Sequence, residues 1–145
     1  MTPESFAQHL VEDAPDAIVY ADPSGTIRFW NRGAERIFGF SAAEALGQSL
    51  DLIIPERLRA RHWDGYRETM RTWRSRYGAG DVLAVPGLHK DGGTISLEFT
   101  IVPLRGPDGT LQGIAAILRD VTARFEELKR LRKLASASGG AGKSG

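Results

Sequence analysis

The sequence predicts an α+β fold in which five strands form a single antiparallel sheet and helices cover one face of it. Two stretches with strand character come early in the chain, several helical stretches follow, and three further strands come late. Compact turn motifs separate neighbouring strands, and this favours antiparallel hairpins. Such a sheet buries one face against its helices, and the space between the two layers can hold a pocket.

The chain begins with a predicted helix and a β-hairpin. The helix, from Thr2 to Ala14, opens with Thr-Pro and carries apolar residues at helical spacing. These apolar residues are Phe6, Leu10 and Val11. The strands expected at Ala17–Ala21 and Thr26–Asn31 flank Asp22-Pro23-Ser24-Gly25, in which the proline presets one dihedral angle and the glycine accepts a positive one.

Two short helices are expected next, and each has its own start and stop signals. Asn31 is the expected N-cap of the first helix, which ends at Gly39. Ser41 starts the second helix, with Glu44 three residues later in a capping-box pattern, and Gly47 ends it.

The longest predicted helix runs from Pro55 to about Trp73. Side chains spaced by four residues fall roughly along one stripe of this helix, while arginines cover its other faces. The stripe consists of Leu58, His62, Tyr66 and Met70.

The last part of the chain is predicted to form three strands and an exit helix. The strands are expected at Tyr77–Val85, Thr94–Leu104 and Leu111–Asp120, with an Asp-Gly turn signal in each connector. A helical pattern then runs from Val121 to Leu134. We therefore divide the chain into an N-terminal helix (1–14), a core (15–121), a C-terminal helix (122–135) and a flexible Gly/Ser-rich tail (136–145).

The composition limits the partners that we expect. The 19 basic and 18 acidic residues give a formal net charge of +1, so no field of one sign is available to collect nucleic acid or an anionic membrane surface. The chain has no cysteine, which excludes disulfides, thiolate metal sites and a cysteinyl photoadduct. No apolar run approaches the ~20 residues that span a bilayer, and the N-terminus is unlike a signal peptide. We expect a cytoplasmic domain with no nucleic-acid or membrane partner.

The order of these elements, and the residues that mark it, resemble the PAS family of sensory domains. The resembling segments are DAIVYADPSGTIRFWNRGAERIFGFSAAEALGQSL and KDGGTISLEFTIVPLRGPDGTLQGIAAILRDVTAR. The resemblance covers about Phe6 to Leu134 and implies a PAS fold that passes a signal through the C-terminal helix, at the Asp120-Val121-Thr122 junction. It also implies a surface ion pair between Glu44 and Lys90.

One further segment resembles a subset of the family. PERLRARHWDGY is similar to the region of haem-binding PAS domains, such as those of bacterial oxygen-sensor kinases, in which a histidine binds the iron. The resemblance implies that His62 is the metal ligand of haem b, and a neutral imidazole on a helix suits that role. A lone histidine on an apolar helix face is more often a core residue, so alternatives stay open. They are FAD held against Trp30, Trp63 or Trp73, a small organic ligand, and no ligand.

The wall opposite His62 is expected to be apolar. Oxygen-sensing relatives place an arginine on the first strand after the long helix, where it donates to the bound gas. The matching position here is Val82 or Leu83, unless Arg76 or Tyr77 turns inward. This favours CO, NO or redox sensing over discriminating capture of O₂. The expected cofactor contacts are His62, Leu58, Tyr66, Met70, Tyr77, Val82, Leu83, Phe99, Ile101, Ile114, Ala116 and Leu118.

The sequence contains no catalytic constellation. Its serines lack a plausible His-acid partner, and no His-Glu-x-x-His motif is present. We therefore expect a non-enzymatic sensor that binds a diatomic gas or another small ligand and acts on a downstream effector domain or protein. The apolar stripe of the N-terminal helix and the spacing of Val121, Phe125 and Leu128 favour a homodimer. The alternative function is a dimerisation module that binds no ligand.

Overall fold

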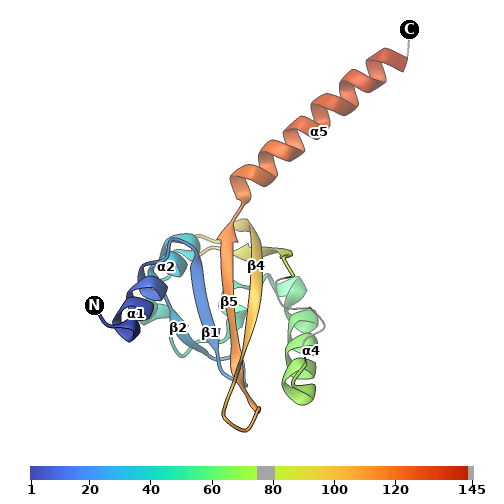
Figure 1. Ribbon diagram of the computed structural model, residues 1–145. Helices are drawn as coiled ribbons and strands as arrows, with labels where there is room; N and C mark the ends of the chain where they lie inside the picture. Colours follow the sequence, from blue (N-terminus) through green and yellow to red (C-terminus); the bar gives the residue numbers. More distant parts are fainter. Residues whose placement is uncertain (75–80, 144–145) are drawn as a thin grey trace.

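The computed structural model describes residues 1–74 and 81–143, with side chains up to residue 138. Within this part the strands form one five-stranded sheet in which all neighbours are antiparallel. Their order across the sheet is β2-β1-β5-β4-β3. The strands are β1 (Ala17–Ala21), β2 (Ile27–Trp30), β3 (Leu83–Leu88), β4 (Thr94–Arg105) and β5 (Leu111–Asp120). The first and last strands of the chain therefore lie side by side in the middle of the sheet (Figure 1). The predicted five-stranded antiparallel α+β fold is confirmed.

Four helical segments lie in the chain between β2 and β3. They are α2 (Arg32–Phe38), α3 (Ala42–Ala45), the 3₁₀ helix η1 (Leu50–Ile53) and α4 (Glu56–Thr72). Alternate residues of β1, namely Ala17, Val19 and Ala21, are buried, as expected for a strand with one face against a core. They belong to the same buried core as Phe38 of α2 and Ile53 of η1, so this face of the sheet is the covered one.

Local capping signals formed as the sequence predicted. Asn31 caps α2 by accepting a hydrogen bond from the Ala34 N–H at 2.9 Å. Ser41 and Glu44 form a complete capping box on α3, and Lys90 Nζ lies 2.6 Å from Glu44 Oε2 in the expected ion pair. These contacts lower the pKa of Glu44 to about 2, with the Lys90 hydrogen bond as the largest cause.

Asn31 also forms hydrogen bonds to other elements that its capping signal in the sequence does not indicate. Its side chain is buried, accepts a second hydrogen bond from the Ile18 N–H at 2.8 Å, and donates to the carbonyls of Val11 and Asp16 at 2.9 and 3.0 Å. The helix α1 (Pro3–Asp13) and strand β1 are thereby joined through one amide to the start of α2. Asn31 is a structural residue that connects three elements.

Two predicted boundaries differ from the structure. The third strand was expected at Tyr77–Val85, but β3 begins at Leu83 and continues to Leu88; residues 75–80 lie outside the described residues. The last helix was expected to end near residue 135, with a flexible tail after it, but α5 runs from Thr122 to Lys143. The alanines and serines after Leu134 are compatible with a helix, whereas Gly139, Gly140 and Gly142 have low helix propensity and made a tail the expectation from sequence.

The two terminal helices leave apolar side chains uncovered. Phe6 and Leu10 of α1 are 57% and 59% exposed. The helix α5 projects from the end of β5 away from the sheet (Figure 1), and its apolar residues Phe125, Leu128 and Leu131 are between 43% and 49% exposed. Among the described helices, none is both long and apolar enough to cross a membrane.

Candidate ligand-binding site

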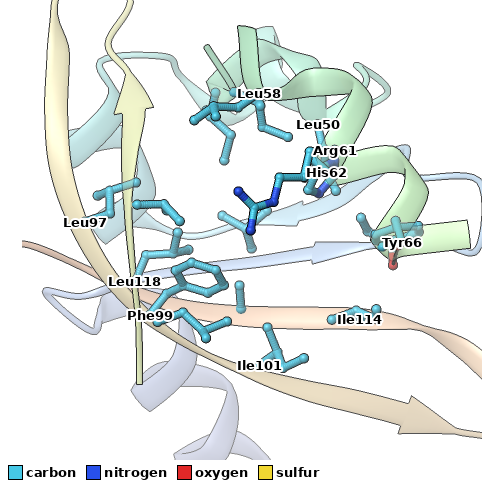
Figure 2. Close-up of a pocket in the computed structure, with 18 of the residues that line it drawn as sticks. Leu50, Leu58, Arg61, His62, Tyr66, Leu97, Phe99, Ile101, Ile114 and Leu118 are labelled. Atoms are coloured by element: carbon cyan, nitrogen blue, oxygen red, sulfur yellow. Dashed lines mark hydrogen bonds between the residues drawn. The ribbon is translucent and has the colours of Figure 1, made fainter. Parts of the chain in front are cut away.

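A cavity of about 560 Å³ lies between α4 and the covered face of the sheet. This volume falls within the usual range for small-molecule and cofactor pockets, ~300–1,000 Å³. Figure 2 shows its two walls, with His62 and Tyr66 on α4 and Leu97, Phe99 and Leu118 on the strands across from them. The cavity is the pocket that a half-covered sheet was expected to leave.

The sheet contributes an entirely apolar wall to this cavity. Residues of β1, β3, β4 and β5 supply it, and none carries a side-chain hydrogen-bond donor or acceptor. This wall is formed by Val19, Ala21, Leu83, Ala84, Val85, Pro86, Leu97, Phe99, Ile101, Ile114, Ala116 and Leu118. A ligand that lies flat against the sheet therefore needs an apolar face.

The helix α4 supplies the polar side chains, and its lining residues correct one prediction. Leu58, His62 and Tyr66 line the cavity as expected, but the stripe continues to Thr69 and not to Met70. The reason is the helical repeat of about 3.6 residues per turn: three successive steps of four residues rotate a side chain by about 120° away from Leu58. Thr69, eleven residues after Leu58, returns to within about 20° of it.

His62 is the polar side chain that distinguishes this cavity. The ring is half-buried, its Nδ1 is fully enclosed, and Nδ1 has no hydrogen-bond partner in the described part of the chain. Nε2 also forms no hydrogen bond there but is not enclosed in this way, so it is the nitrogen left accessible. Burial lowers the pKa of His62, and the negative charge of Asp51 opposes this effect in part. The imidazole is therefore neutral at neutral pH, with one nitrogen available to a ligand.

The other aromatic side chains near His62 are already engaged. The Tyr66 hydroxyl donates to the Asp22 carbonyl at 2.6 Å, and burial, followed by the charge of Asp22, raises the pKa of this phenol. Trp63 Nε1 donates to Asp51 Oδ1 at 2.7 Å. Tyr66 therefore presents only its ring to the cavity, and Trp63 does not line it.

Three of the expected contacts on the β3 side have different outcomes. Leu83 begins β3 and lines the cavity, so the apolar residue expected opposite His62 is present. Val82 precedes the strand, is 64% exposed and does not line the cavity. Tyr77, like Arg76, lies outside the described residues. Phe99, Ile101, Ile114, Ala116 and Leu118, the other cofactor contacts expected on the sheet, all line the cavity.

Sequence reasoning missed several lining residues. The clearest are Arg57 and Arg61, which are exposed, line the cavity from one side of α4, and form no ion pair or hydrogen bond within the described residues. Their spacing of four residues beside the Leu58–His62 pair could have indicated the same face. Val19 and Ala21 could have been found from the alternation along β1. Leu50, Ile53 and Ile54 carry no such local signal, because they lie in or directly after the short 3₁₀ helix η1.

Comparison with known families and proteins gives one consistent result. A family model described as "PAS fold" matches residues 11–126. The sensor protein FixL of Bradyrhizobium diazoefficiens is 31% identical over 93% of this chain and 26% of the relative. The cell-division control histidine kinase PdhS of Brucella ovis is 30% identical, over 86% of this chain and 12% of the relative. The chain thus spans about a quarter or less of the length of these relatives.

Solved structures give the same fold. The PAS domain of a protein from Colwellia psychrerythraea superposes with a TM-score of 0.73 at 24% identity, over 84% of this chain and 99% of that one. An RNA-binding light-oxygen-voltage receptor superposes with a TM-score of 0.72 at 25% identity, over 92% of this chain and 37% of that one. The expected fold family and the resemblance to bacterial sensor proteins are both confirmed.

Proposed function

This chain belongs to the PAS-fold family, and on that premise we propose that it is a sensory domain that binds haem b through His62. In this proposal the domain responds to a diatomic gas or to a change of redox state, has no catalytic activity of its own, and acts through α5 on a downstream effector. The observation that carries the proposal is the state of His62: a neutral imidazole on a helix, at a cavity wall, with no hydrogen bond in the described part of the chain. The enclosed Nδ1 makes this imidazole costly to the fold, and the accessible Nε2 is the nitrogen that would bind the iron.

The rest of the cavity suits a porphyrin. A porphyrin is a flat, largely apolar ring with two carboxylates on one edge, and the sheet wall offers only apolar side chains. Arg57 and Arg61 line the cavity, remain exposed, and have no acidic partner within residues 1–74 and 81–143, so both are available to pair with carboxylates. Bound haem iron supplies ligand binding or one-electron chemistry, and the polarity of the surrounding pocket tunes it.

Metal binding at this cavity depends on the porphyrin. The described residues contain no group of three or more His, Asp or Glu side chains that could hold a metal ion by themselves. His62 would therefore bind iron that the macrocycle already holds. The apolar wall that includes Leu83 provides no donor to a bound gas, which supports CO, NO or redox sensing over capture of O₂.

Flavin remains the alternative cofactor, and the similarity to a light-oxygen-voltage receptor is the observation that favours it. Three features weigh against it. The chain has no cysteine for a photoadduct. Trp30, Trp63 and Trp73 do not line the cavity. The sheet wall has no polar side chain to pair with the hydrogen-bonding edge of an isoalloxazine ring. A dimerisation module without any ligand is the remaining alternative.

The route from the cavity to α5 runs along β4 and β5. Leu97 and Leu118 line the cavity, and two residues beyond Leu118 the strand ends at Asp120, which pairs in register with Leu97. Asp120 accepts a hydrogen bond from the Thr122 N–H at 2.9 Å, and Thr122 Oγ1 accepts one from the Ser96 N–H, also at 2.9 Å. A shift of either strand would therefore move the start of α5. A ligand can drive this movement only by binding the two arrangements with different affinity.

The proposal is tested by reconstituting the purified chain with hemin and recording absorption spectra. We expect a shifted Soret band in the wild type, its loss or a marked change in His62→Ala, and no change in the matched control His9→Ala, which replaces an exposed histidine of α1. A wild-type spectrum equal to that of free hemin, or one that His62→Ala leaves unchanged, would contradict haem ligation. A yellow purified protein that releases flavin on denaturation would establish the alternative.

A further inference from the structure

No hydrogen bond from the described residues sets the orientation of the His62 ring. Histidines that bind metals almost always donate the N–H of their second ring nitrogen to a carboxylate, a carbonyl or a water, and this fixes the ring. The Nδ1 of His62 has no such protein partner among the described residues. Packing must therefore hold the ring, and the side chains that pack on it decide where Nε2 points.

Two aromatic rings of α4 contact His62. The Trp63 ring lies with its centroid 4.7 Å from that of His62 at an interplanar angle of 74°, and the Tyr66 ring lies 5.7 Å away. Trp63 and Tyr66 also contact each other edge to face, with centroids 5.5 Å apart. We call these three residues the α4 aromatic cluster. Edge-to-face contacts of this kind favour defined relative orientations.

Trp63 is itself held from two sides. Its Nε1 donates to Asp51 Oδ1 at 2.7 Å, which ties the indole to η1. Its six-membered ring lies against Gly25 so closely that a Cβ atom at Gly25 would come within 2.1 Å of Trp63 Cη2 and 2.2 Å of Cζ3. Only a residue without a side chain leaves room for the indole at this place in the β1–β2 turn (residues 22–26).

The same turn also holds Tyr66, and it is internally well braced. The Tyr66 hydroxyl donates to the Asp22 carbonyl at 2.6 Å. The Asp22 carboxylate accepts hydrogen bonds from the backbone N–H groups of Ser24 and Thr26 at 3.0 and 3.1 Å, and from Arg28 Nε at 2.9 Å. The turn is therefore a firm support that touches both neighbours of His62 in the α4 aromatic cluster.

We infer that Trp63 is a positioning residue for His62, and that the β1–β2 turn, through Gly25, and Asp51 fix Trp63 in the place where it does this. The β1–β2 turn thus belongs functionally to the ligand-binding site although it does not line the cavity. The effect on haem rests on the function proposed above, whereas the effect on the His62 ring does not.

Two glycines of the chain make a matched pair for testing this inference. Gly25 and Gly47 have nearly the same φ, +82° and +86°, so alanine at either position meets a similar penalty for a positive φ. They differ in surroundings: a Cβ at Gly25 collides with Trp63, whereas a Cβ at Gly47 meets nothing within 4 Å. The difference between Gly25→Ala and Gly47→Ala therefore isolates the displacement of the Trp63 indole.

The first readout is the His62 side-chain resonance in haem-free protein, followed by ¹H–¹³C correlation spectra and assigned with His62→Ala. An aromatic ring shifts the resonances of protons near it, so moving the indole changes the position of the His62 signals. We expect a shift in Gly25→Ala but not in Gly47→Ala. Trp63→Phe, whose shorter ring lacks the N–H that bonds to Asp51, should shift the same signals and serves if Gly25→Ala does not fold.

The second readout is the hemin dissociation constant from absorption titrations of the same variants. We expect binding to weaken about 10- to 100-fold in Gly25→Ala and Trp63→Phe, as for other residues that orient a metal ligand, and to be unchanged in Gly47→Ala. Unshifted His62 resonances in both variants would overturn the inference, as would shifted resonances with unchanged hemin affinity. If the wild type binds no hemin, the proposed function fails, and His62 resonances that stay unshifted in both variants still overturn the inference by themselves.

Discussion

Replacing His62 by leucine should stabilise the haem-free protein while abolishing haem binding. The enclosed Nδ1 has no partner within the described residues, and an unsatisfied buried polar atom costs about 1–3 kcal/mol. Leucine fills a similar volume without a polar atom, but it loses the edge-to-face contact to Trp63, which is worth about 0.5–1.5 kcal/mol. The two effects together predict a gain of about 1 kcal/mol in the free energy of unfolding.

This gain is large enough to measure. In a domain of this size, 1 kcal/mol raises the midpoint of thermal unfolding by about 2–4 °C. Urea unfolding of haem-free protein, followed by far-UV circular dichroism, gives the free energy directly. His62→Ala, which leaves a void in place of the ring, should lose stability. His9→Leu on the exposed face of α1 is the control, and it should stay within about 0.5 kcal/mol of the wild type.

The opposite sign would refute the reasoning. If His62→Leu lowers the free energy of unfolding by about 1 kcal/mol or more, the imidazole makes a net stabilising contribution to the fold. The presence of histidine at this position would then be explained by its contribution to the fold and not by service to a ligand. If His62→Leu raises the free energy of unfolding and removes the shifted Soret band, the histidine lowers the stability of the haem-free fold and is required for haem binding.

Four other perturbations test separate parts of the structure. The double charge reversal Arg57→Glu plus Arg61→Glu should weaken hemin binding, and the loss should be larger at low ionic strength. The control Arg67→Glu replaces an arginine that pairs with Asp64 and should leave hemin affinity unchanged. Equal losses of affinity in both variants would exclude carboxylate pairing at the cavity. Asn31→Ala removes four hydrogen bonds of 2.8–3.0 Å and should cost about 4 kcal/mol in urea unfolding, against about 1 kcal/mol for the exposed cap Ser41→Ala. Hydrogen bonds from the Ser24 hydroxyl and then from Arg28 lower the pKa of Asp22 to about 2. Asp22→Asn should therefore lose its full amount of stability above about pH 4, and this loss should vanish as the pH falls toward 2. A loss of stability that does not depend on pH would refute this. Spin labels at Glu127 should report interchain distances in a homodimer, and these distances should change when the cofactor or its ligand binds. The absence of an interchain signal would exclude pairing through α5. Distances that are identical in all states would leave α5 as a rigid support.

The sequence by itself determined the elements whose signals are local. Asn31, Ser41 with Glu44, and the Asp-Gly connectors act through hydrogen bonds and backbone preferences within a few residues of themselves, so they indicate caps and turns before any fold is known. The apolar residues along the strands also indicated half of the sheet wall, including Phe99, Ile101, Ile114, Ala116 and Leu118.

Only the tertiary structure decided how these elements meet. The choice of Thr69 over Met70 depends on how α4 is rotated against the sheet, and the start of β3 at Leu83 depends on its pairing with Phe99 of β4. The contact between Gly25 and Trp63 joins residues 38 positions apart, and no local pattern marks either as the partner of the other. The unpaired state of His62 Nδ1 is likewise a property of everything packed around it. Contacts between distant segments arise from the packing of whole elements, and for that reason the residues that orient His62 became visible only in the folded chain.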